Sequence, residues 1–215
     1  MRIGIFGTGI VGTTLGSGFI TAGDEVRIGS RTAGNPSAAD WVRTNGRSAS
    51  QGTFADAAQY GEILLNCTAG SASLDALKLA GKENMKGKML IDVANPLDVS
   101  KGMPPALTVC NTDSLGEQIQ REFPDVTVVK ALNTVNCSVM VNPSLVPGQH
   151  DLFICGNNQS AKAEVMELLK NRFGWKSFVD LGDISGARMM EMYVTLWVRL
   201  YGQFKSPNFN IRIVK

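Results

Sequence analysis

The chain has 215 residues, of which 44% are hydrophobic and 19% are charged. That length suffices for one sizeable core, or for one domain with a modest appendage, but not for two full domains. The net charge of +2 gives no field strong enough to suggest nucleic acid as a partner. No apolar run reaches the roughly 18 residues that a membrane-spanning helix needs, so we expect no membrane partner.

Histidine and cysteine are too sparse and too scattered to suggest a metal site. The single histidine, His150, lies in a proline-glycine loop and is expected to be solvated, and Cys67, Cys110, Cys137 and Cys155 form no C-x-x-C pair. We therefore expect neither a bound metal nor a disulfide framework. Most of these thiols flank apolar, strand-like runs, which is typical of reduced, partly buried cysteines in a cytoplasmic protein.

The amino-terminal segment reads as strand, glycine turn and helix, the opening of a dinucleotide-binding fold. A β-branched and aromatic run from Arg2 to Phe6 stops at a G-x-G-x-x-G motif. This apolar start lacks an A-x-A-like cleavage site, so we interpret it as structure rather than as a signal peptide. The motif comprises Gly7, Thr8, Gly9, Ile10, Val11 and Gly12.

Each glycine of the motif has a distinct expected task. Gly7 makes the tight turn, Gly9 lets a pyrophosphate approach the backbone without meeting a Cβ atom, and Gly12 lets the helix pack on the strand. The helix then presents unpaired N–H groups and the positive end of its dipole to the phosphates. The sequence therefore predicts that the motif binds a dinucleotide.

The end of the second strand predicts which dinucleotide binds. A strand over 25–28 leads into Gly29, Ser30, Arg31 and Thr32, so no carboxylate is present to accept hydrogen bonds from a ribose 2′-hydroxyl. The Arg31 guanidinium, flanked by the hydroxyls of Ser30 and Thr32, suits a phosphate monoester instead. We therefore predict NADP rather than NAD as the cofactor. The alternative is an ordinary glycine-rich turn followed by a solvated arginine.

Helices and strands alternate along the middle of the chain. Expected helices cover 38–44, 53–60, 71–79 and 114–123, and expected strands cover 47–50, 62–67, 89–93 and 126–132. Gly61 is expected to end the second of these helices as a left-handed glycine. The segment 101–111 holds two adjacent prolines and is expected to be a surface loop. The alternation predicts a Rossmann-type α/β fold with a doubly wound, mostly parallel sheet and a short carboxyl-terminal helical extension.

Small and polar residues follow three of the expected strands. Because ligands of open α/β sheets sit outside the carboxyl ends of the strands, we expect these residues to border the dinucleotide. One of them, Asn95, could bind the nicotinamide carboxamide or ribose, or could make an Asx-turn before the proline. The residues are Thr68, Ala69 and Gly70 after one strand, Asn95 and Pro96 after the next, and Asn133 after a third.

The remaining sequence predicts a small carboxyl-terminal part. After a loop over 142–150, strands over 151–155 and 175–181 flank a helix over 160–172. The tail over 209–214 alternates as a strand or an extended arm would. We therefore divide the chain into an NADP-binding domain, residues 1–150, and a small part, residues 151–215, that completes the sheet and covers the cleft.

A last long helix, expected over 185–204, carries a broad apolar stripe at three-and-four spacing. We interpret this stripe as core packing, and a wall over the crevice or a dimer face is the alternative. The members of the stripe are Met189, Met192, Tyr193, Leu196, Trp197, Leu200 and Phe204.

Several of these motifs together resemble one family of oxidoreductases. The glycine motif, the GSR strand tip and the TAG, ANP and ALNTVN strand ends are joined by a D-x-G-x-x-x-x-A-R element, which comprises Asp180, Gly182, Ala187 and Arg188. In this combination the sequence resembles, over essentially its full length, the NADP oxidoreductases that depend on a deazaflavin, coenzyme F420. The reductase domains of membrane ferric reductases are similar too.

The resemblance implies hydride exchange between NADPH and a flavin-like ring that lies near Asn133. The best-known deazaflavin reductases look to carry a histidine at this position, which leaves the acceptor open. The residues suit hydride transfer without a side-chain acid or base, so we expect the alignment of two bound rings to provide the catalysis. The expected partners are a small-molecule hydride acceptor and a second copy of the chain.

Two other functions stay in competition with this interpretation. One is an imine reductase resembling pyrroline-5-carboxylate reductase, which begins similarly but carries a longer helical carboxyl-terminal region. The other is a binding module that senses NADPH without turning it over.

Overall fold

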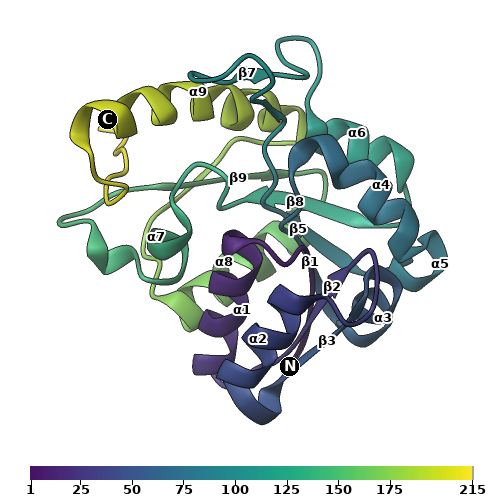
Figure 1. Cartoon of the computed structure of the whole chain (residues 1–215). Coiled ribbons are helices and arrows are strands. Elements are labelled where there is room, and N and C mark those ends of the chain that lie inside the picture. Colours follow the sequence, from purple (N-terminus) through teal and green to yellow (C-terminus); the bar gives the residue numbers. More distant parts are fainter. Residues whose placement is uncertain (215) are drawn as a thin grey trace.

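An eight-stranded sheet runs through the centre of the protein, with helices on both of its faces (Figure 1). The computed structural model describes residues 1–214, and Lys215, the last residue of the expected carboxyl-terminal part, lies outside the described residues. The strands of this sheet are β1 (Arg2–Phe6), β2 (Glu25–Ser30), β3 (Ala49–Thr53), β4 (Ile63–Asn66), β5 (Met89–Asp92), β8 (Thr127–Ala131), β9 (Leu152–Gly156) and β10 (Phe178–Asp180).

The strand order is β10-β9-β8-β5-β4-β1-β2-β3. Strands β8 and β9 pair antiparallel, whereas all other neighbours in this sheet pair in parallel. The predicted doubly wound, mostly parallel Rossmann sheet is therefore confirmed.

Two hydrophobic cores lie on opposite faces of the sheet. Helices α1, α2, α7 and α8 cover one core, which includes Phe19, Trp41 and Trp175. Helices α3, α4, α5 and α6 cover the other, which includes Phe6 and Phe123. Within residues 1–214, no helix is both long enough and apolar enough to cross a bilayer. The bounds are α1 (Ile10–Thr21), α2 (Pro36–Asn45), α3 (Phe54–Tyr60), α4 (Gly70–Ala80), α5 (Lys82–Met85), α6 (Leu115–Glu122), α7 (Cys137–Val141), α8 (Gln159–Phe173) and α9 (Ala187–Phe204).

Local sequence signals fix several helix ends. The side chain of Asn35 caps α2 by accepting a hydrogen bond from the Ala38 backbone nitrogen, and a proline occupies the first turn. Helix α3 begins with a capping box in which Thr53 and Asp56 each accept a hydrogen bond from the other's backbone nitrogen. Gly61 has a φ of −71°, so its predicted left-handed conformation is wrong. Glycine is needed there for space, because a Cβ atom would lie 2.5 Å from the Gly4 backbone nitrogen.

Several short elements and one strand position differ from the prediction. The expected strand over 47–50 lies later, because Gly46–Ser48 forms a turn of 3-10 helix and β3 begins at Ala49. The expected loop over 101–111 contains β7 (Ala106–Leu107), which pairs antiparallel with β6 (Leu97–Asp98). Helices α5 and α7 were also not predicted. Elements this short do not establish a periodicity in the sequence.

The last helix, α9, contradicts the core interpretation of its apolar stripe. Met189, Leu196 and Phe204 are 58%, 51% and 57% exposed. The buried residues of α9 are Ala187, Met190, Glu191 and Val194, which lie on the neighbouring face of the helix. Figure 1 shows α9 lying across the top of the molecule, apart from the two main helical layers. The stripe is therefore only partly covered in the single chain: these three residues are exposed, and the other four, Met192, Tyr193, Trp197 and Leu200, are half-buried.

The tail after α9 is an extended arm rather than a strand. The Asp151 backbone nitrogen donates to the Ile211 carbonyl oxygen at 2.9 Å, and the Ile213 nitrogen donates to Asp151 Oδ2 at 2.6 Å. Phe209 stacks on Trp197 with ring centroids 5.2 Å apart. The arm therefore ties the end of α9 back to the start of β9.

The exposure of the α9 stripe gives a first prediction. Leu196→Ser is expected to change the free energy of unfolding by less than about 0.5 kcal/mol, because exposed positions tolerate such changes. Val194→Ala, two residues away on the buried face, is expected to cost about 1 kcal/mol or more. Urea denaturation of both variants measures the difference. A destabilising Leu196→Ser would contradict the prediction and would indicate that another molecule, such as the expected second copy, covers the stripe.

Candidate functional site

The predicted site residues come together at one edge of the sheet. Strands β1, β2, β4, β5 and β8 run in the same direction, so their carboxyl ends lie along this edge. The loops that follow these ends contain the segments predicted to bind the dinucleotide, and the amino terminus of α1 opens onto the same edge (Figure 1). These segments are Gly7 to Gly12, Ser30 to Thr32, Thr68 to Gly70, Asn95 with Pro96, and Asn133.

The glycine loop has the close packing that the motif predicts at Gly7 and Gly12. Gly7 has a φ of 114°, and a Cβ atom there would lie 2.7 Å from the Cys67 carbonyl oxygen. A Cβ atom at Gly12 would lie 2.3 Å from the Gly7 carbonyl oxygen. By contrast, a Cβ atom at Gly9 would meet nothing within 4 Å, and the neighbouring Ile10 side chain is 74% exposed. The loop is therefore closed at Gly7 and Gly12 and open at Gly9.

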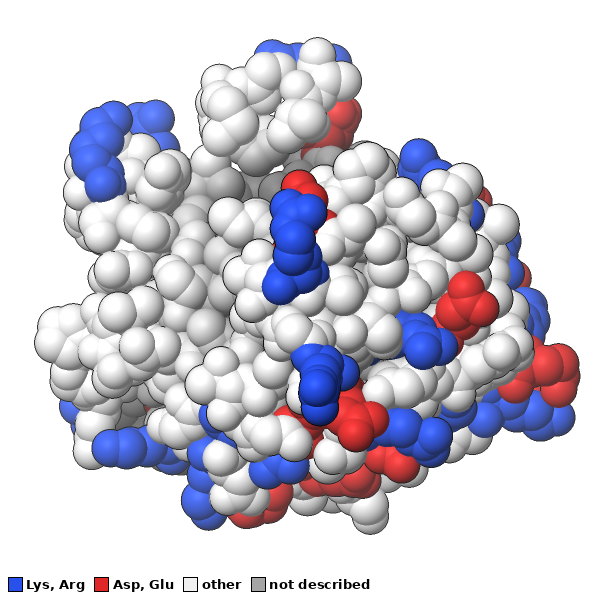
Figure 2. Space-filling model, turned by 60° about the horizontal axis from the view of Figure 1, so that its bottom comes forward, with Lys and Arg blue, Asp and Glu red and all other residues white. Residues whose placement is uncertain are grey.

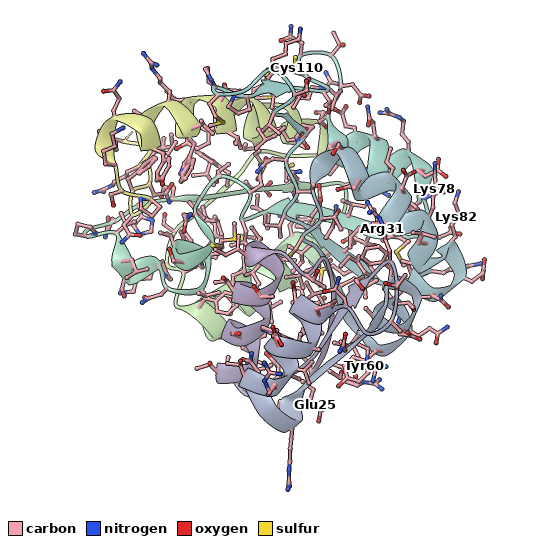
Figure 3. All side chains as sticks on the ribbon, viewed as in Figure 1. Glu25, Arg31, Tyr60, Lys78, Lys82 and Cys110 are labelled. Atoms are coloured by element: carbon pink, nitrogen blue, oxygen red, sulfur yellow. The ribbon has the colours of Figure 1, made fainter. Side chains whose placement is uncertain are left out.

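The turn after β2 exposes one guanidinium. Ser30 is buried, and its hydroxyl donates to the Thr32 carbonyl oxygen at 2.6 Å, so this hydroxyl shapes the turn. Arg31 and Thr32 are exposed. Figure 3 shows Arg31 on the side of the molecule that carries α3 and α4. An anion can therefore reach Arg31 and Thr32 from solvent, whereas the Ser30 proton is already engaged.

The loops after β4 and β5 are in direct contact. A Cβ atom at Gly70 would lie 2.1 Å from the Asn95 carbonyl oxygen, so the two loops can approach this closely only where residue 70 is glycine. The Thr68 hydroxyl lies 2.6 Å from Asn66 Oδ1 and 2.8 Å from Ser73 Oγ. Ala69 precedes α4 as its N-cap, so the unpaired N–H groups of that helix also open onto this edge.

Asn95 and Asn133 bind each other. Asn95 Nδ2 donates to the Asn133 carbonyl oxygen, and Asn133 Nδ2 donates to Asn95 Oδ1, both at 2.9 Å. Asn133 Nδ2 also donates to the Met190 carbonyl oxygen of α9, at 3.1 Å. Neither sequence-based alternative for Asn95 anticipated this pairing. Its amide nitrogen is engaged by Asn133, and the Leu97 nitrogen donates to the Asn95 backbone carbonyl rather than to the side chain of an Asx-turn.

Two buried oxygens at the end of β8 have no hydrogen-bond partner among residues 1–214. They are Asn133 Oδ1 and Thr134 Oγ1, in residues that are only 4% and 1% exposed. The preceding residue, Leu132, is buried and has a φ of 68°, which is unusual for any residue except glycine. Unpaired buried acceptors and strained backbone cost free energy, and they gather where a ligand completes a site.

A buried ionic cluster next to these loops was not anticipated from the sequence. Lys130 Nζ lies 2.7 Å from Asp92 Oδ2 and 2.9 Å from Glu191 Oε1, and all three side chains are buried. Burial lowers the pKa of Lys130, but the two carboxylates outweigh burial and hold this pKa above its usual value. Burial raises the pKa of Glu191. The available signal was a charged residue inside each of two apolar strands, MLID and TVVKA.

The thiols close to the strand ends are poor nucleophiles. Desolvation, together with the charge of Asp92, raises the pKa of Cys67, and burial raises the pKa of Cys155 to about 12. Both are free thiols and are therefore protonated at neutral pH. His150 is not solvated as expected: it is half-buried, and its ring nitrogens lie 3.0 Å from the Pro143 carbonyl oxygen and 3.0 Å from Asn210 Nδ2.

Comparison with known proteins points to one family. A family model described as NADP oxidoreductase, coenzyme F420-dependent, matches residues 2–96. A crystal structure of a candidate F420-dependent NADP-reductase from Arthrobacter sp. FB24 is 46% identical, with complete coverage of both chains (100% each) and a TM-score of 0.95. The F420-dependent NADP reductase of Methanothermobacter marburgensis is 29% identical over 222 residues, covering 99% of this chain and 98% of that protein.

A membrane-protein relative matches as well. The metalloreductase STEAP3 of Rattus norvegicus is 28% identical over 210 residues, which cover 96% of this chain but 38% of that protein. This match accords with the resemblance to the reductase domains of membrane ferric reductases. The full-length similarity to the Arthrobacter chain and the match of the family model lead to one conclusion: this chain belongs to the family of coenzyme F420-dependent NADP oxidoreductases.

Proposed function

We propose that the protein transfers a hydride between NADPH and a deazaflavin or flavin-like ring. The Methanothermobacter relative is named for both reactants, NADP and coenzyme F420. The observation that carries the proposal is the unpaired Oδ1 atom of Asn133, which is held at the same sheet edge as the open glycine loop. This oxygen is a hydrogen-bond acceptor that the protein leaves unpaired, and it lies where the carboxyl ends of the strands meet. It therefore suits a ligand that donates an N–H group.

The residues at this edge suit a phosphorylated dinucleotide. The open backbone at Gly9 and the amino terminus of α1 would hold the pyrophosphate. Arg31, with the exposed Thr32, would hold a 2′-phosphate. Asn133 Oδ1 would accept a hydrogen bond from the nicotinamide carboxamide. Bound NADPH supplies the hydride itself.

The chain's own contribution is alignment. Asn133 is fixed by the Asn95 side chain and by the Met190 carbonyl oxygen, so its free oxygen has one orientation. Holding two reacting groups in place can lower a barrier by about 7 to 11 kcal/mol. The protonated Cys67 thiol offers no competing nucleophile beside the site. Hydride transfer between the two aligned rings is proposed to proceed without a side-chain acid or base.

The acceptor is proposed to lie between the nicotinamide side of the site and α9. Met190 brings α9 to Asn133, and the Ile10 side chain opens onto the same edge. On the face shown in Figure 2, charged side chains gather along the lower and right-hand parts, whereas the hollow near the top has mostly uncharged walls, with Lys or Arg side chains on the left and lower right of its rim. Such a surrounding suits a flat, largely apolar ring.

Stopped-flow absorbance at the nicotinamide band tests the proposal. The purified chain would be mixed with NADPH and, separately, with coenzyme F420, FMN and a cyclic imine. Rapid oxidation with the deazaflavin or the flavin, but not with the imine, is the expected result. Oxidation with the imine alone would favour an imine reductase. Calorimetry that detects NADPH binding, with no oxidation by any acceptor, would favour a sensing module. The absence of binding to either pyridine coenzyme would overturn the proposal.

A further inference from the structure

One buried ammonium contacts both sides of the proposed site. Lys130 Nζ donates to Asp92 Oδ2 and to the carbonyl oxygen of Ala94, the residue before Asn95. It also lies 2.9 Å from Glu191 Oε1 on α9. Glu191 accepts hydrogen bonds from the Leu115 and Gly116 nitrogens at the start of α6, at 2.9 and 3.0 Å. A single side chain therefore links the loop after β5 to α9, and through α9 to α6.

The same cluster reaches the loop after β4. Asp92 Oδ1 accepts a hydrogen bond from Asn66 Nδ2 at 2.8 Å, and Asn66 Oδ1 accepts one from the Thr68 hydroxyl at 2.6 Å. The Asn95 and Asn133 pair forms a second link, since Asn133 Nδ2 donates to Met190 in α9. The Lys130 cluster thus joins the loops after β4 and β5 to α9, and the Asn95–Asn133 pair joins the loops after β5 and β8 to the same helix.

Stability alone does not account for this arrangement. Well-packed apolar side chains of similar volume are often as stabilising as a buried ion pair or more so, because desolvation of the charges opposes their attraction. A buried polar network with its members paired nevertheless fixes one geometry, since any shift leaves a charge without its partner. Glu191 is the only acidic residue of α9, and it is 1% exposed. Helix α9 therefore has one position against the sheet in which this buried carboxylate is paired.

We propose that Lys130 is a positioning residue that locks α9 and the Ala94–Pro96 loop together, so that the hydride acceptor and the nicotinamide are held by one rigid unit. The inference rests on the proposed function, because it assigns the acceptor side of the site to α9. Lys130 touches neither reactant and acts through Ala94 and Glu191.

Lys130→Met tests the proposal, with Lys162→Met as a matched control. Lys162 is 4% exposed and also joins a carboxylate to a backbone carbonyl, with Asp180 Oδ1 at 2.7 Å and the Gly182 oxygen at 2.9 Å, but it lies on α8. Lys130→Met is expected to slow hydride transfer by up to about 100-fold, as small misalignments of reacting groups do. The dissociation constant of NADPH is expected to change by less than about threefold, because the phosphate contacts are untouched.

Hydrogen exchange on the chain without ligands provides a readout that does not depend on activity. In Lys130→Met, amide exchange in residues 187–194 and in residues 93–97 is expected to rise together, and Lys162→Met is expected to leave both segments protected. A rise in one segment only, or equal effects of the two variants on hydride transfer, would overturn the proposal. If both segments respond together but no acceptor is ever reduced, the proposed function fails while the link through Lys130 stands.

Two further variants keep the test decisive. Glu191→Gln is expected to reproduce the slow hydride transfer of Lys130→Met, and the double variant is expected to be no slower than Lys130→Met alone, because the two residues act through one link. Additive losses would contradict this. Should Lys130→Met fail to fold, the triple variant D92N/K130M/E191Q removes all three charges and takes its place, with the same expected exchange and the same loss of rate.

Discussion

Gly9→Ala is expected to weaken dinucleotide binding by about 10-fold to 100-fold without destabilising the protein. The added Cβ atom would meet no protein atom within 4 Å, so the fold has room for it. The same atom would occupy the space through which a pyrophosphate approaches the backbone. Steric conflict of this kind costs about 1 to 3 kcal/mol, and each 1.4 kcal/mol is a factor of ten in affinity. Calorimetric titration with NADPH measures the loss.

Gly12→Ala is the matched control for this prediction, because it lies in the same motif but faces the protein. Its Cβ atom would lie 2.3 Å from the Gly7 carbonyl oxygen, which is too close for backbone atoms. We expect it to destabilise the protein by about 1 to 3 kcal/mol, or about 2 to 4 °C in Tm for each kcal/mol. Unchanged NADPH affinity in Gly9→Ala would show that the pyrophosphate does not cross this loop.

Arg31→Ala is expected to weaken NADPH binding by about 10-fold to 150-fold while changing NADH binding by less than about twofold. The guanidinium would form charge-assisted hydrogen bonds with the 2′-phosphate, each contributing about 1.5 to 3 kcal/mol. NADH lacks this phosphate, so its affinity does not depend on the guanidinium. Because Arg31 is exposed, the NADPH effect is expected to shrink as ionic strength rises.

Arg43→Ala serves as the control for the Arg31 prediction. Arg43 is an exposed arginine of the neighbouring helix α2, where it pairs with Asp40 at 2.8 Å. We expect this variant to bind both coenzymes as the unaltered protein does. Equal losses of NADPH and NADH affinity in Arg31→Ala would show that this arginine does not read the phosphate. Fluorescence titrations of both variants at two salt concentrations separate these outcomes.

Features encoded in short stretches of sequence were predictable. The tasks of Gly7 and Gly12 follow from backbone geometry within one turn, and the structure shows the close contacts that exclude a side chain at each. The strand-end residues were also found, because a βαβ pattern implies a parallel sheet, and a parallel sheet places the carboxyl ends of its strands at one edge. No knowledge of distant contacts was needed for either inference.

Features that depend on distant pairing were not predictable. Asn95 and Asn133 are 38 positions apart, as are Asp92 and Lys130, and no spacing rule connects such residues. The prediction that the apolar stripe of α9 packs in the core failed for another reason. Three-and-four spacing establishes that a helix has an apolar face, but it does not establish whether the chain's own core covers that face. Met190 and Val194 are covered, whereas Met189 and Leu196 are not.

The contact between Gly70 and Asn95 has a consequence for redesign of the coenzyme pocket. Because a methyl group at position 70 would fall 2.1 Å from the Asn95 carbonyl oxygen, the two loops cannot be exchanged independently. If the loop after β4 were replaced by the corresponding loop of a relative, it would contact a loop after β5 to which its shape is not matched. Chimeras that replace either loop should therefore graft residues 68–70 and 94–97 from the same donor, as a single block.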